Sequence, residues 1–409
     1  MRRVLVAGGG AAGLMAAISA ARAGAKVTLL EKNRQAGKKI LATGNGRCNL
    51  TNVRQEASFY RGEHPEFALK VLESFGMHDT LRLFSELGIF TKNRNGYLYP
   101  YSDQASSVAE ILRMEAERQN IKLALNTEIE RIEKRGDVFA AVTKGWTYEG
   151  DALILAAGSA AAPETGSDGS GYRLAGQMGH RIIRPLPALV QLRCRESFFA
   201  KLAGLRMDAR IRLYIDGKEA AQDQGEVQFT KNGVSGIPVF QISRWAVKAL
   251  DEGKKTAVSL DLLPLFSEEE LEAFLEGRIR DCGYKKGTAF LTGLFPEKMG
   301  ACLIERAGIG REKPARQWNE EERKRLAAAI KNFCAEVTGS GDFAQAQVCS
   351  GGVDTEEICP ETMESRLTPG LYFAGEVADI DGACGGYNLQ WAWSSGYLAG
   401  RSAAEGGKG

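Results

Sequence analysis

Several features that mark common classes of protein are missing from this sequence of 409 residues. Its eight cysteines form no C-x-x-C pair, so neither a zinc ribbon nor a dithiol redox centre is predicted. Only three histidines are present, which argues against a histidine-rich metal site. No apolar run reaches the roughly 18 residues that a membrane-spanning helix needs. Lys and Arg number 53 against 51 for Asp and Glu, and a net charge of +2 gives no electrostatic reason to expect nucleic acid or a membrane surface.

We also expect no secretory signal, because Met1 leads almost directly into an apolar run. Cysteines without a disulfide pattern then favour free thiols in a reducing, cytoplasmic setting. The three histidines, His64, His78 and His180, fall in helical or helix-end contexts of surface type, where a structural role is expected.

Glycine, in contrast, is abundant: the chain has 48, and they cluster in short motifs. Gly8, Gly10 and Gly13 form G-x-G-x-x-G directly after an apolar run at residues 3–7, and an Ala-rich helix and a second strand follow. Glu31 ends that second strand, where an acidic side chain accepts hydrogen bonds from a ribose. Strand, glycine loop, helix, strand and acid together predict a dinucleotide site with the pyrophosphate at the helix N-terminus. Glu31 disfavours the phosphate of NADP but does not separate FAD from NAD.

The next segment favours a long dinucleotide. Residues 37–52, GKKILATGNGRCNLTN, are rich in Gly and Asn where a Rossmann dehydrogenase would continue its strand–helix alternation. Arg47, Asn49 and Thr51 offer hydrogen-bond donors, and Lys38 and Lys39 offer charges that neutralise phosphate. We expect this stretch to lie along the cofactor; the alternative is a solvated loop.

The C-terminal part of the chain offers a second half of the same site. Residues 371–376, LYFAGE, predict a strand, and Gly386 precedes a helix that begins near Tyr387. Amides at that helix start are suited to an electron-rich ring edge, and either Asp379 or Asp381 is suited to a sugar-like polyol. A site built from both ends of the chain fits a large flavin dinucleotide, whereas NAD does not require the second end. The sequence therefore favours FAD.

Long motifs at both ends carry a family resemblance. GGGAAGLMAA, GNGRCNLTN, LILAAGSAAAPETGSDGSGY and GLYFAGEVADIDGACGGYNLQWAWSSG together resemble the BaiN-like, or aminoacetone-oxidase-like, FAD-dependent oxidoreductases. The resemblance covers essentially the whole chain. It implies an α/β fold, in which a Rossmann-like FAD-binding domain of glutathione-reductase type is interrupted by an inserted β-barrel and a small helical domain. It also places the adenine side of FAD near residues 127–129. The chain is similar, more loosely, to fumarate-reductase-like and steroid-dehydrogenase-like flavoproteins.

Motifs and resemblance together nominate the residues that bind FAD, and no metal ligands are predicted. The predicted cofactor-binding residues are Gly8, Gly10, Ala11, Ala12, Gly13, Glu31, Lys32, Lys39, Thr43, Gly44, Gly46, Arg47, Cys48, Asn49, Glu128, Ile129, Ala157, Gly158, Gly375, Glu376, Asp381, Gly386, Tyr387, Asn388 and Leu389.

The composition changes after Pro187. Residues 188–264 alternate apolar and polar positions and predict an inserted β-barrel domain, whereas residues 265–340 predict a helical insert. The FAD-binding domain is then discontinuous, with residues 1–187 and 341–409. An insertion that faces the flavin is a natural place for substrate selection.

Local signals predict individual elements. Asn95-Gly96 lies between short aromatic runs and predicts a hairpin turn. Ser267 and Asn319 are expected to begin helices, and Trp391 and Trp393 are expected in the core.

Three residues near the expected flavin are candidates for catalysis. Arg47 either contacts phosphate or polarises a substrate carbonyl, and Cys48 is either a packed thiol or a redox partner. Tyr387 is either a proton donor or an aromatic that packs on the flavin. Residues 228–236, QFTKNGVSG, either approach the isoalloxazine, as the resemblance suggests, or form a plain hairpin.

The predicted function is an oxidoreductase in which NAD(P)H feeds hydride through flavin N5 to a conjugated carbonyl, such as an enone of a steroid-like molecule. The sequence has no second G-x-G-x-x-G unit, so NAD(P)H must dock transiently in the substrate cleft. The alternatives are a flavin oxidase or dehydrogenase of a small amine, an RNA-modifying flavoprotein, and a non-catalytic flavin sensor. The expected partner is a small-molecule substrate, with no nucleic acid and no membrane, and no signal defines an oligomeric state.

Overall fold

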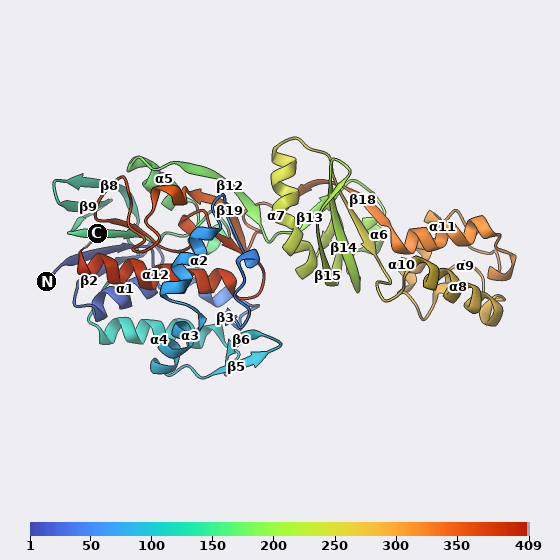
Figure 1. The fold of residues 1–409 in the computed structure, drawn as a ribbon, viewed down its shortest axis with the longest axis horizontal. Helices are drawn as coiled ribbons and strands as arrows, with labels where there is room; N and C mark the ends of the chain where they lie inside the picture. The colour runs from blue at the N-terminus through green and yellow to red at the C-terminus, as the bar shows by residue number, and fades with distance from the viewer. Residues whose placement is uncertain (407–409) are drawn as a thin grey trace. The chain divides into compact units, whose positions relative to one another are not determined.

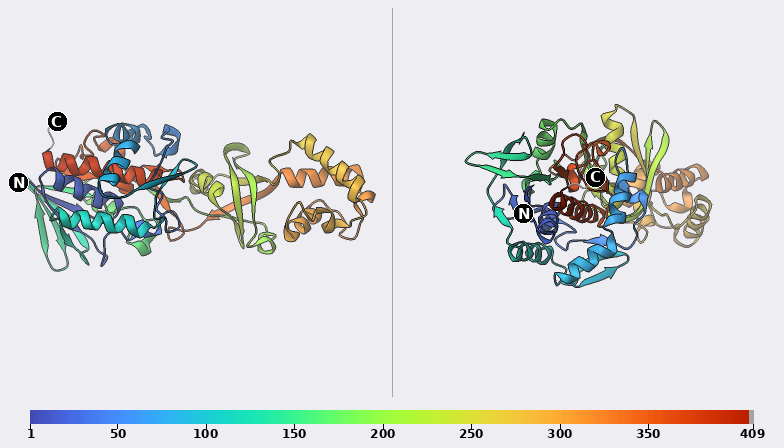
Figure 2. Two further views of the ribbon diagram at one scale, coloured as in Figure 1. Left: turned by 90° about the horizontal axis from the view of Figure 1, so that it is seen from below. Right: turned by 60° about the vertical axis from the view of Figure 1, so that its left-hand side comes forward.

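The computed structural model describes residues 1–406, and the chain forms two compact units (Figure 1 and Figure 2). The first unit combines Met1–Pro187 with the chain from Phe343 onward, and the second is Ala188–Asp342. All described residues of the large hydrophobic core belong to the first unit. The second unit is therefore an insertion into a domain whose core forms without it.

A five-stranded parallel sheet organises the first unit, in the order β20-β11-β1-β2-β7. Its strands are β1 (Arg3–Ala7), β2 (Lys26–Leu30), β7 (Lys122–Ala124), β11 (Ala152–Leu155) and β20 (Leu371–Phe373). Most of their residues are buried and apolar, as expected for a parallel sheet that is covered on both faces. The strand from the C-terminal segment pairs directly with β11, so both ends of the chain build one sheet. The predicted α/β fold with a Rossmann-type domain is confirmed.

Two long helices from opposite ends of the chain pack closely, α1 (Ala11–Arg22) and α12 (Tyr387–Glu405), and Figure 1 and Figure 2 show them side by side. Small residues permit this approach. A Cβ atom on Gly396 would lie 2.5 Å from the carbonyl oxygen of Ala12, and one on Gly400 would lie 2.2 Å from that of Ala16. Trp391 and Trp393 of α12 are fully buried, as the sequence predicted.

The other elements of the first unit surround this framework. They are β3 (Thr51–Asn52), β4 (Tyr60–Arg61), α2 (Glu66–Ser74), α3 (Met77–Glu86), β5 (Thr91–Arg94), β6 (Tyr97–Pro100), α4 (Ala105–Arg118), β8 (Ile129–Arg135), β9 (Val138–Thr143), β10 (Thr147–Gly150), α5 (Ser170–Gln177), β12 (Ile182–Ala188), β19 (Val348–Val353) and β21 (Asp381–Gly382). Short 3-10 helices cover Lys39–Ala42, Ala57–Phe59, Pro163–Thr165, Thr355–Glu357 and Gly375–Val377. Asn95 and Gly96 both have positive φ and close the β5–β6 hairpin, which confirms the predicted turn.

The second unit contains a closed barrel in the order β13-β16-β15-β14-β17-β18. Its strands are β13 (Leu192–Cys194), β14 (Arg206–Ile215), β15 (Lys218–Thr230), β16 (Gly233–Ser235), β17 (Thr256–Asp261) and β18 (Phe333–Ser340). Phe199 of the short helix α6 (Phe199–Leu202), Phe229 and Phe333 are buried in its interior.

Two expectations for this unit were wrong in detail. Residues 237–251 are not strand but the helix α7 (Ile237–Asp251), whose buried Val239, Ile242 and Ala246 follow a helical period. The segment predicted as a helical insert, residues 265–340, ends in β18, because β13 and β17 require a strand between them to close the barrel.

Between β17 and β18 the chain forms α8 (Glu268–Cys282), α9 (Gly287–Leu291), α10 (Glu297–Arg306), a 3-10 helix (Ala315–Gln317) and α11 (Glu320–Lys331). Ser267 and Asn319 begin α8 and α11 with capping boxes, as predicted. A buried ion pair of 2.7 Å joins Lys331 at the end of α11 to Asp261 at the end of β17. This pair fixes the helical part to the barrel within the second unit.

His180 does not lie on the surface, as the sequence suggested, but is buried after α5. Its Nδ1 lies 2.9 Å from Glu357 and its Nε2 lies 2.8 Å from the hydroxyl of Ser365. The ring also packs edge-on against Phe373 of β20. It therefore links α5 to the segment that leads into the sheet.

No helix within residues 1–406 has both the length and the apolar character needed to cross a membrane. All eight cysteines are free thiols.

Candidate flavin-binding site

The glycines of the loop after β1 differ in how closely other atoms approach them. Gly8 has a φ of +104°, and a Cβ atom there would lie 2.5 Å from the carbonyl oxygen of Ala156. A Cβ on Gly13 would lie 1.9 Å from the carbonyl oxygen of Gly8. A Cβ on Gly10, in contrast, would meet nothing within 4 Å. Gly8 and Gly13 therefore let helix and strand approach, and Gly10 leaves open space where α1 begins.

The start of α1 is suited to an anion. Gly10 provides no side-chain cap, and the first turn contains no acidic residue. The first-turn amides of Ala11, Ala12 and Gly13 precede the first helical hydrogen bond, from Leu14 N to the Gly10 carbonyl. Free amides and the positive helix end together favour a pyrophosphate beside Gly10.

Glu31 follows β2 and is held by the loop itself. One carboxylate oxygen accepts from Gly9 N at 2.7 Å, and the other accepts from Asn33 N and Nδ2, each at 2.7 Å. The side chain is 7% exposed. An ionised carboxylate has about four acceptor positions, so three protein bonds leave it able to accept from a ribose hydroxyl.

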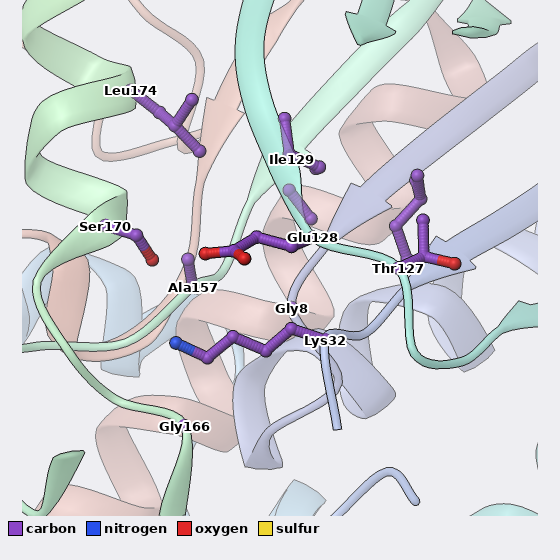
Figure 3. Close-up of a pocket in the computed structure, with 11 residues that line it drawn as sticks. Gly8, Lys32, Thr127, Glu128, Ile129, Ala157, Gly166, Ser170 and Leu174 are labelled. Atoms are coloured by element: carbon purple, nitrogen blue, oxygen red, sulfur yellow. The ribbon is translucent and has the colours of Figure 1, made fainter. Parts of the chain in front are cut away.

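A pocket extends from the glycine loop toward β8 and α5 (Figure 3). It is lined by Ala7, Gly8, Leu30, Lys32, Thr127, Glu128, Ile129, Ala157, Gly166, Ser170 and Leu174. Figure 3 shows the side chains of Lys32, Glu128 and Ser170 converging on this space, and Lys32 pairs with Asp168 at 2.6 Å. The pocket includes residues 127–129, where the resemblance places the adenine side of FAD. Ser170 and Leu174 were missed because only the packing of α5 against β8 brings them here.

Between the two halves of the site, Lys39 and Glu376 form an ion pair, with 2.7 Å between Nζ and Oε2. Ser159 donates to the same carboxylate oxygen at 2.9 Å, and Lys39 also donates to the carbonyl of Ala161 at 3.3 Å. In this arrangement Lys39 neutralises a carboxylate of the protein. The pair fixes the 3-10 helix after β2 to the segment that follows β20.

The far half of the site brings the two ends of the chain together. Gly385 and Gly386 have φ values of +125° and +97°, and a Cβ on Gly386 would lie 2.8 Å from the backbone of Thr51. Asn52 Nδ2 donates to the Gly385 carbonyl at 3.0 Å, and Trp393 donates to the Leu50 carbonyl at 3.0 Å. The predicted assembly of residues 37–52 with the C-terminal segment is therefore observed.

This half of the candidate site contains an unpaired polar atom. Asn49 is buried, and its Oδ1 has no hydrogen-bond partner among residues 1–406. A buried acceptor without a partner is costly, so a donor from a bound molecule would stabilise it. The open space at Gly10, the Glu31 carboxylate, the pocket at residues 127–129 and the unpaired Asn49 Oδ1 together fit FAD.

Some residues of the candidate site also hold the local fold. Asn388 accepts from Gly382 N at 2.7 Å and donates to the Gly382 carbonyl at 2.8 Å, which closes the loop before α12. Both carboxylate oxygens of Asp379 accept backbone amides, from Glu63 at 2.7 Å and Gly351 at 3.0 Å. Both aspartates suggested for a polyol, Asp379 and Asp381, stay candidates.

The three candidate catalytic residues differ in environment. Arg47 is exposed, with its guanidinium 5.9 Å from the ring centre of Tyr99. Cys48 is fully buried, and burial raises the pKa of its thiol to about 12, which keeps it protonated. Tyr387 stacks on Phe59 with ring centres 4.5 Å apart, and burial raises its pKa to about 12. The environment of Cys48 is that of a packed thiol.

A parallel sheet with a glycine loop, completed by a C-terminal helix start, defines a Rossmann-type flavin-dependent oxidoreductase. The family model described as "HI0933-like protein Rossmann domain" matches residues 2–402. The chain belongs to this HI0933-like family, as the resemblance to BaiN-like oxidoreductases predicted. It is an FAD-dependent oxidoreductase.

The chain is similar to curated proteins along its whole length. It is 47% identical to "3-dehydro-bile acid delta(4,6)-reductase" of Clostridium scindens, over 99% of this chain and 100% of the relative. It is 30% identical to "Ribosomal RNA dihydrouridine synthase" of Escherichia coli, over 96% of this chain and 95% of the relative. Among solved structures, 3-ketosteroid delta1-dehydrogenase from Sterolibacterium denitrificans matches with a TM-score of 0.49 and 13% identity, over 99% of this chain and 100% of that chain.

Proposed function

We propose that this protein catalyses NAD(P)H-dependent reduction of a conjugated carbonyl compound, such as a steroid-like enone, with FAD as the hydride carrier. The observation that carries the proposal is the 47% identity to a bile acid reductase over 99% of this chain and 100% of the relative. The aligned region therefore includes the inserted unit, residues 188–342, as well as the unit that we propose binds flavin. We place substrate selection in that inserted unit.

When bound, FAD supplies hydride exchange at N5. The chain's own residues would hold it: the first-turn amides of α1 bind the pyrophosphate, Glu31 accepts from the ribose, and the first-turn amides of α12 bind the electron-rich ring edge. Asn49 would accept a hydrogen bond from the ligand with its unpaired Oδ1. Arg47, which is exposed, would contact a phosphate or a substrate carbonyl.

The test isolates the oxidative half of the reaction. Holoprotein reduced with dithionite under anaerobic conditions is mixed with a 3-oxo-Δ4,6 steroid acid, and the visible flavin spectrum is followed. We expect rapid return of the oxidised spectrum and a product that has gained two hydrogen atoms. If the enone leaves the reduced spectrum unchanged and a small amine bleaches the oxidised enzyme, the protein is an amine oxidase or dehydrogenase instead.

A second candidate function is supported by the similarity to a ribosomal RNA dihydrouridine synthase. The chemistry is related, because the reducible double bond of uracil is also conjugated to a carbonyl group. The same reduced holoprotein is therefore mixed with a ribosomal RNA transcript. Formation of dihydrouridine without turnover of the steroid enone would favour this function.

We also propose a cytoplasmic location. The eight free thiols support it, since a reducing compartment leaves cysteines unpaired.

A further inference from the structure

One face of the β5–β6 hairpin is rich in exposed aromatic and basic side chains. The register pairs Lys92 with Tyr99 and Arg94 with Tyr97, and a hydrogen bond from Tyr101 N to the Phe90 carbonyl extends the pairing by one row. Because alternate residues of a strand share a face, these side chains stand together. We call this surface the hairpin face; it consists of Phe90, Lys92, Arg94, Tyr97, Tyr99 and Tyr101.

The opposite face of the same hairpin explains why these rings point outward. Leu98 and Pro100 are buried beneath it. Phe90 is 75% exposed, Tyr101 is 62% exposed and Tyr97 is 38% exposed. Large apolar rings at such exposure, on a strand whose other side already supplies the core, mark a binding surface.

Cations lie over these rings. The Lys92 ammonium is 5.1 Å from the ring centre of Tyr101, and the guanidinium groups of Arg94 and Arg47 lie 5.8 and 5.9 Å from that of Tyr99. Asp103 is the carboxylate in this group, and it pairs with Lys92 and Arg94. No ion pair joins Arg47 to a carboxylate in the part of the chain that the structure describes. The group therefore contains three cations and the one carboxylate of Asp103, so its net charge is positive.

The hairpin face adjoins the candidate flavin site within the same unit. A Cβ on Gly385 would lie 2.9 Å from the Tyr97 ring, and Asn52, paired with Tyr97, donates to the Gly385 carbonyl. Arg47 lies two residues before Asn49, whose Oδ1 is unpaired. A molecule bound on this face would thus lie beside the loop that precedes α12.

We propose that the hairpin face binds the nicotinamide dinucleotide that reduces the flavin, an inference that rests on the proposed function. Exposed rings on a strand stack on planar bases, and adjacent cations bind phosphate. The excess positive charge complements a dianionic pyrophosphate. The one glycine fingerprint of the sequence lies in the candidate FAD site, so the donor needs a second surface. The sequence suggested the substrate cleft for this role, and the hairpin face replaces it in this proposal. RNA is the less suitable occupant, because RNA binding draws on many phosphate contacts, and the chain has a net charge of only +2.

The test compares two double variants of the holoprotein. Arg94→Gln/Tyr101→Ser removes a cation and a ring from the hairpin face. Lys144→Gln/Trp146→Ser removes an exposed cation and an exposed ring from the turn between β9 and β10, where the Trp146 backbone carbonyl, not its ring, closes the turn. FAD content and the thermal midpoint of each variant check that the fold is intact.

Two readouts are measured: the affinities for NAD⁺ and NADP⁺ by isothermal titration calorimetry, and anaerobic reduction of the flavin by NADH and NADPH in stopped flow. We expect the hairpin-face variant to weaken dinucleotide binding by about fivefold or more and to raise the half-saturating donor concentration equally. The limiting reduction rate and the control variant should be unchanged. Reoxidation of the dithionite-reduced variant by the enone should also be unchanged, which separates this inference from the proposed function.

Other occupants of the hairpin face predict different results. Unchanged binding of both dinucleotides would overturn the proposal. So would a variant that loses affinity only for a single-stranded RNA oligonucleotide, that raises the KM only for the steroid acid, or that changes only the oligomeric state in sedimentation.

Discussion

At the scale of single residues, two glycines of the loop after β1 differ in the space around them. Gly13 is needed by the protein, because a Cβ there would overlap the carbonyl of Gly8 at 1.9 Å. Gly10 has an ordinary φ of −75° and open space around it, so the fold does not require a glycine there. We therefore propose that Gly10 leaves room for the pyrophosphate.

We predict that Gly10→Ala and Gly13→Ala separate these roles. Gly10→Ala should keep the unfolding free energy of the apoprotein and weaken FAD binding by tenfold or more, about 1.4 kcal/mol. Gly13→Ala should destabilise the apoprotein itself by about 1–3 kcal/mol, because the helix must shift. Denaturant unfolding and FAD titration measure both effects. Equal FAD affinity in Gly10→Ala and wild type would contradict the assignment of the pyrophosphate to this loop.

We predict that Tyr387 serves by packing. Its ring is 3% exposed and stacked on Phe59, and with a pKa of about 12 its hydroxyl stays protonated across the neutral range. Tyr387→Phe keeps the ring and should keep turnover within about twofold, whereas Tyr387→Ser should lower FAD affinity and stability, since a buried aromatic is lost. A loss of turnover by 100-fold or more in Tyr387→Phe, with normal FAD content and a changed pH profile, would instead identify the hydroxyl as the proton donor.

At the scale of elements, the sequence predicted those that local signals define. The β1–α1–β2 unit, the Asn95-Gly96 hairpin and the caps at Ser267 and Asn319 all depend on neighbouring residues, and all are observed. Helix α7 was missed because it lies between strands whose apolar and polar residues alternate. Its own helical pattern covers only one short segment, which was included in the barrel.

Other features depend on contacts between distant segments. β18 was assigned to the helical part because its role, to pair with β13 and β17, exists only in the closed barrel. His180 gave no sign of burial, because Glu357 and Ser365 lie far along the sequence. The adenine-side pocket likewise required α5 to pack against β8. Long-range pairing, not local propensity, decides each of these cases.

We predict a pH effect on stability from His180. Ser365 Oγ accepts amides from Leu367 and Thr368, so its hydroxyl donates to the unprotonated Nε2. Burial lowers the pKa of His180 in the folded state below the usual value of about 6.5. The folded state therefore binds the proton less readily, and the stability contributed by the neutral ring is present above about pH 6.5 and is lost as the pH falls.

The measurement is the free energy of unfolding between pH 7 and pH 5. Wild type should lose at most about 1.4 kcal/mol per pH unit through this group, and His180→Gln should show a flatter dependence. His78→Gln, at an exposed histidine, is the control and should follow wild type. A wild type that gains stability as the pH falls would contradict the neutral assignment.

At the scale of the whole molecule, the chain forms a flavin-binding unit with its own core and an inserted unit of barrel and helices. The chain leaves the first unit after β12 and returns to it before β19. These two strands pair with each other, so both ends of the insertion are attached to one small sheet of the first unit. We propose that the first unit binds FAD and that the second selects the substrate.

Deletion of the insertion tests this division. Replacement of residues 189–341 by a short Gly/Ser linker should leave FAD affinity within about tenfold of wild type, because the residues we assign to FAD lie in the first unit. Turnover of the enone should be lost. Spectroscopic FAD titration and product analysis measure the two effects, and a deletion variant that retains enone turnover would contradict substrate selection by the second unit.

The most direct test of the central claim is the visible spectrum of the purified holoprotein, followed anaerobically through two additions. NADH or NADPH is added first, and a steroid-like enone second. We predict an oxidised flavin spectrum that bleaches when the nicotinamide is added and returns when the enone is added, with one enone consumed for each nicotinamide oxidised. A protein that does not bind FAD, or a bleached flavin whose colour the enone does not restore, would contradict it.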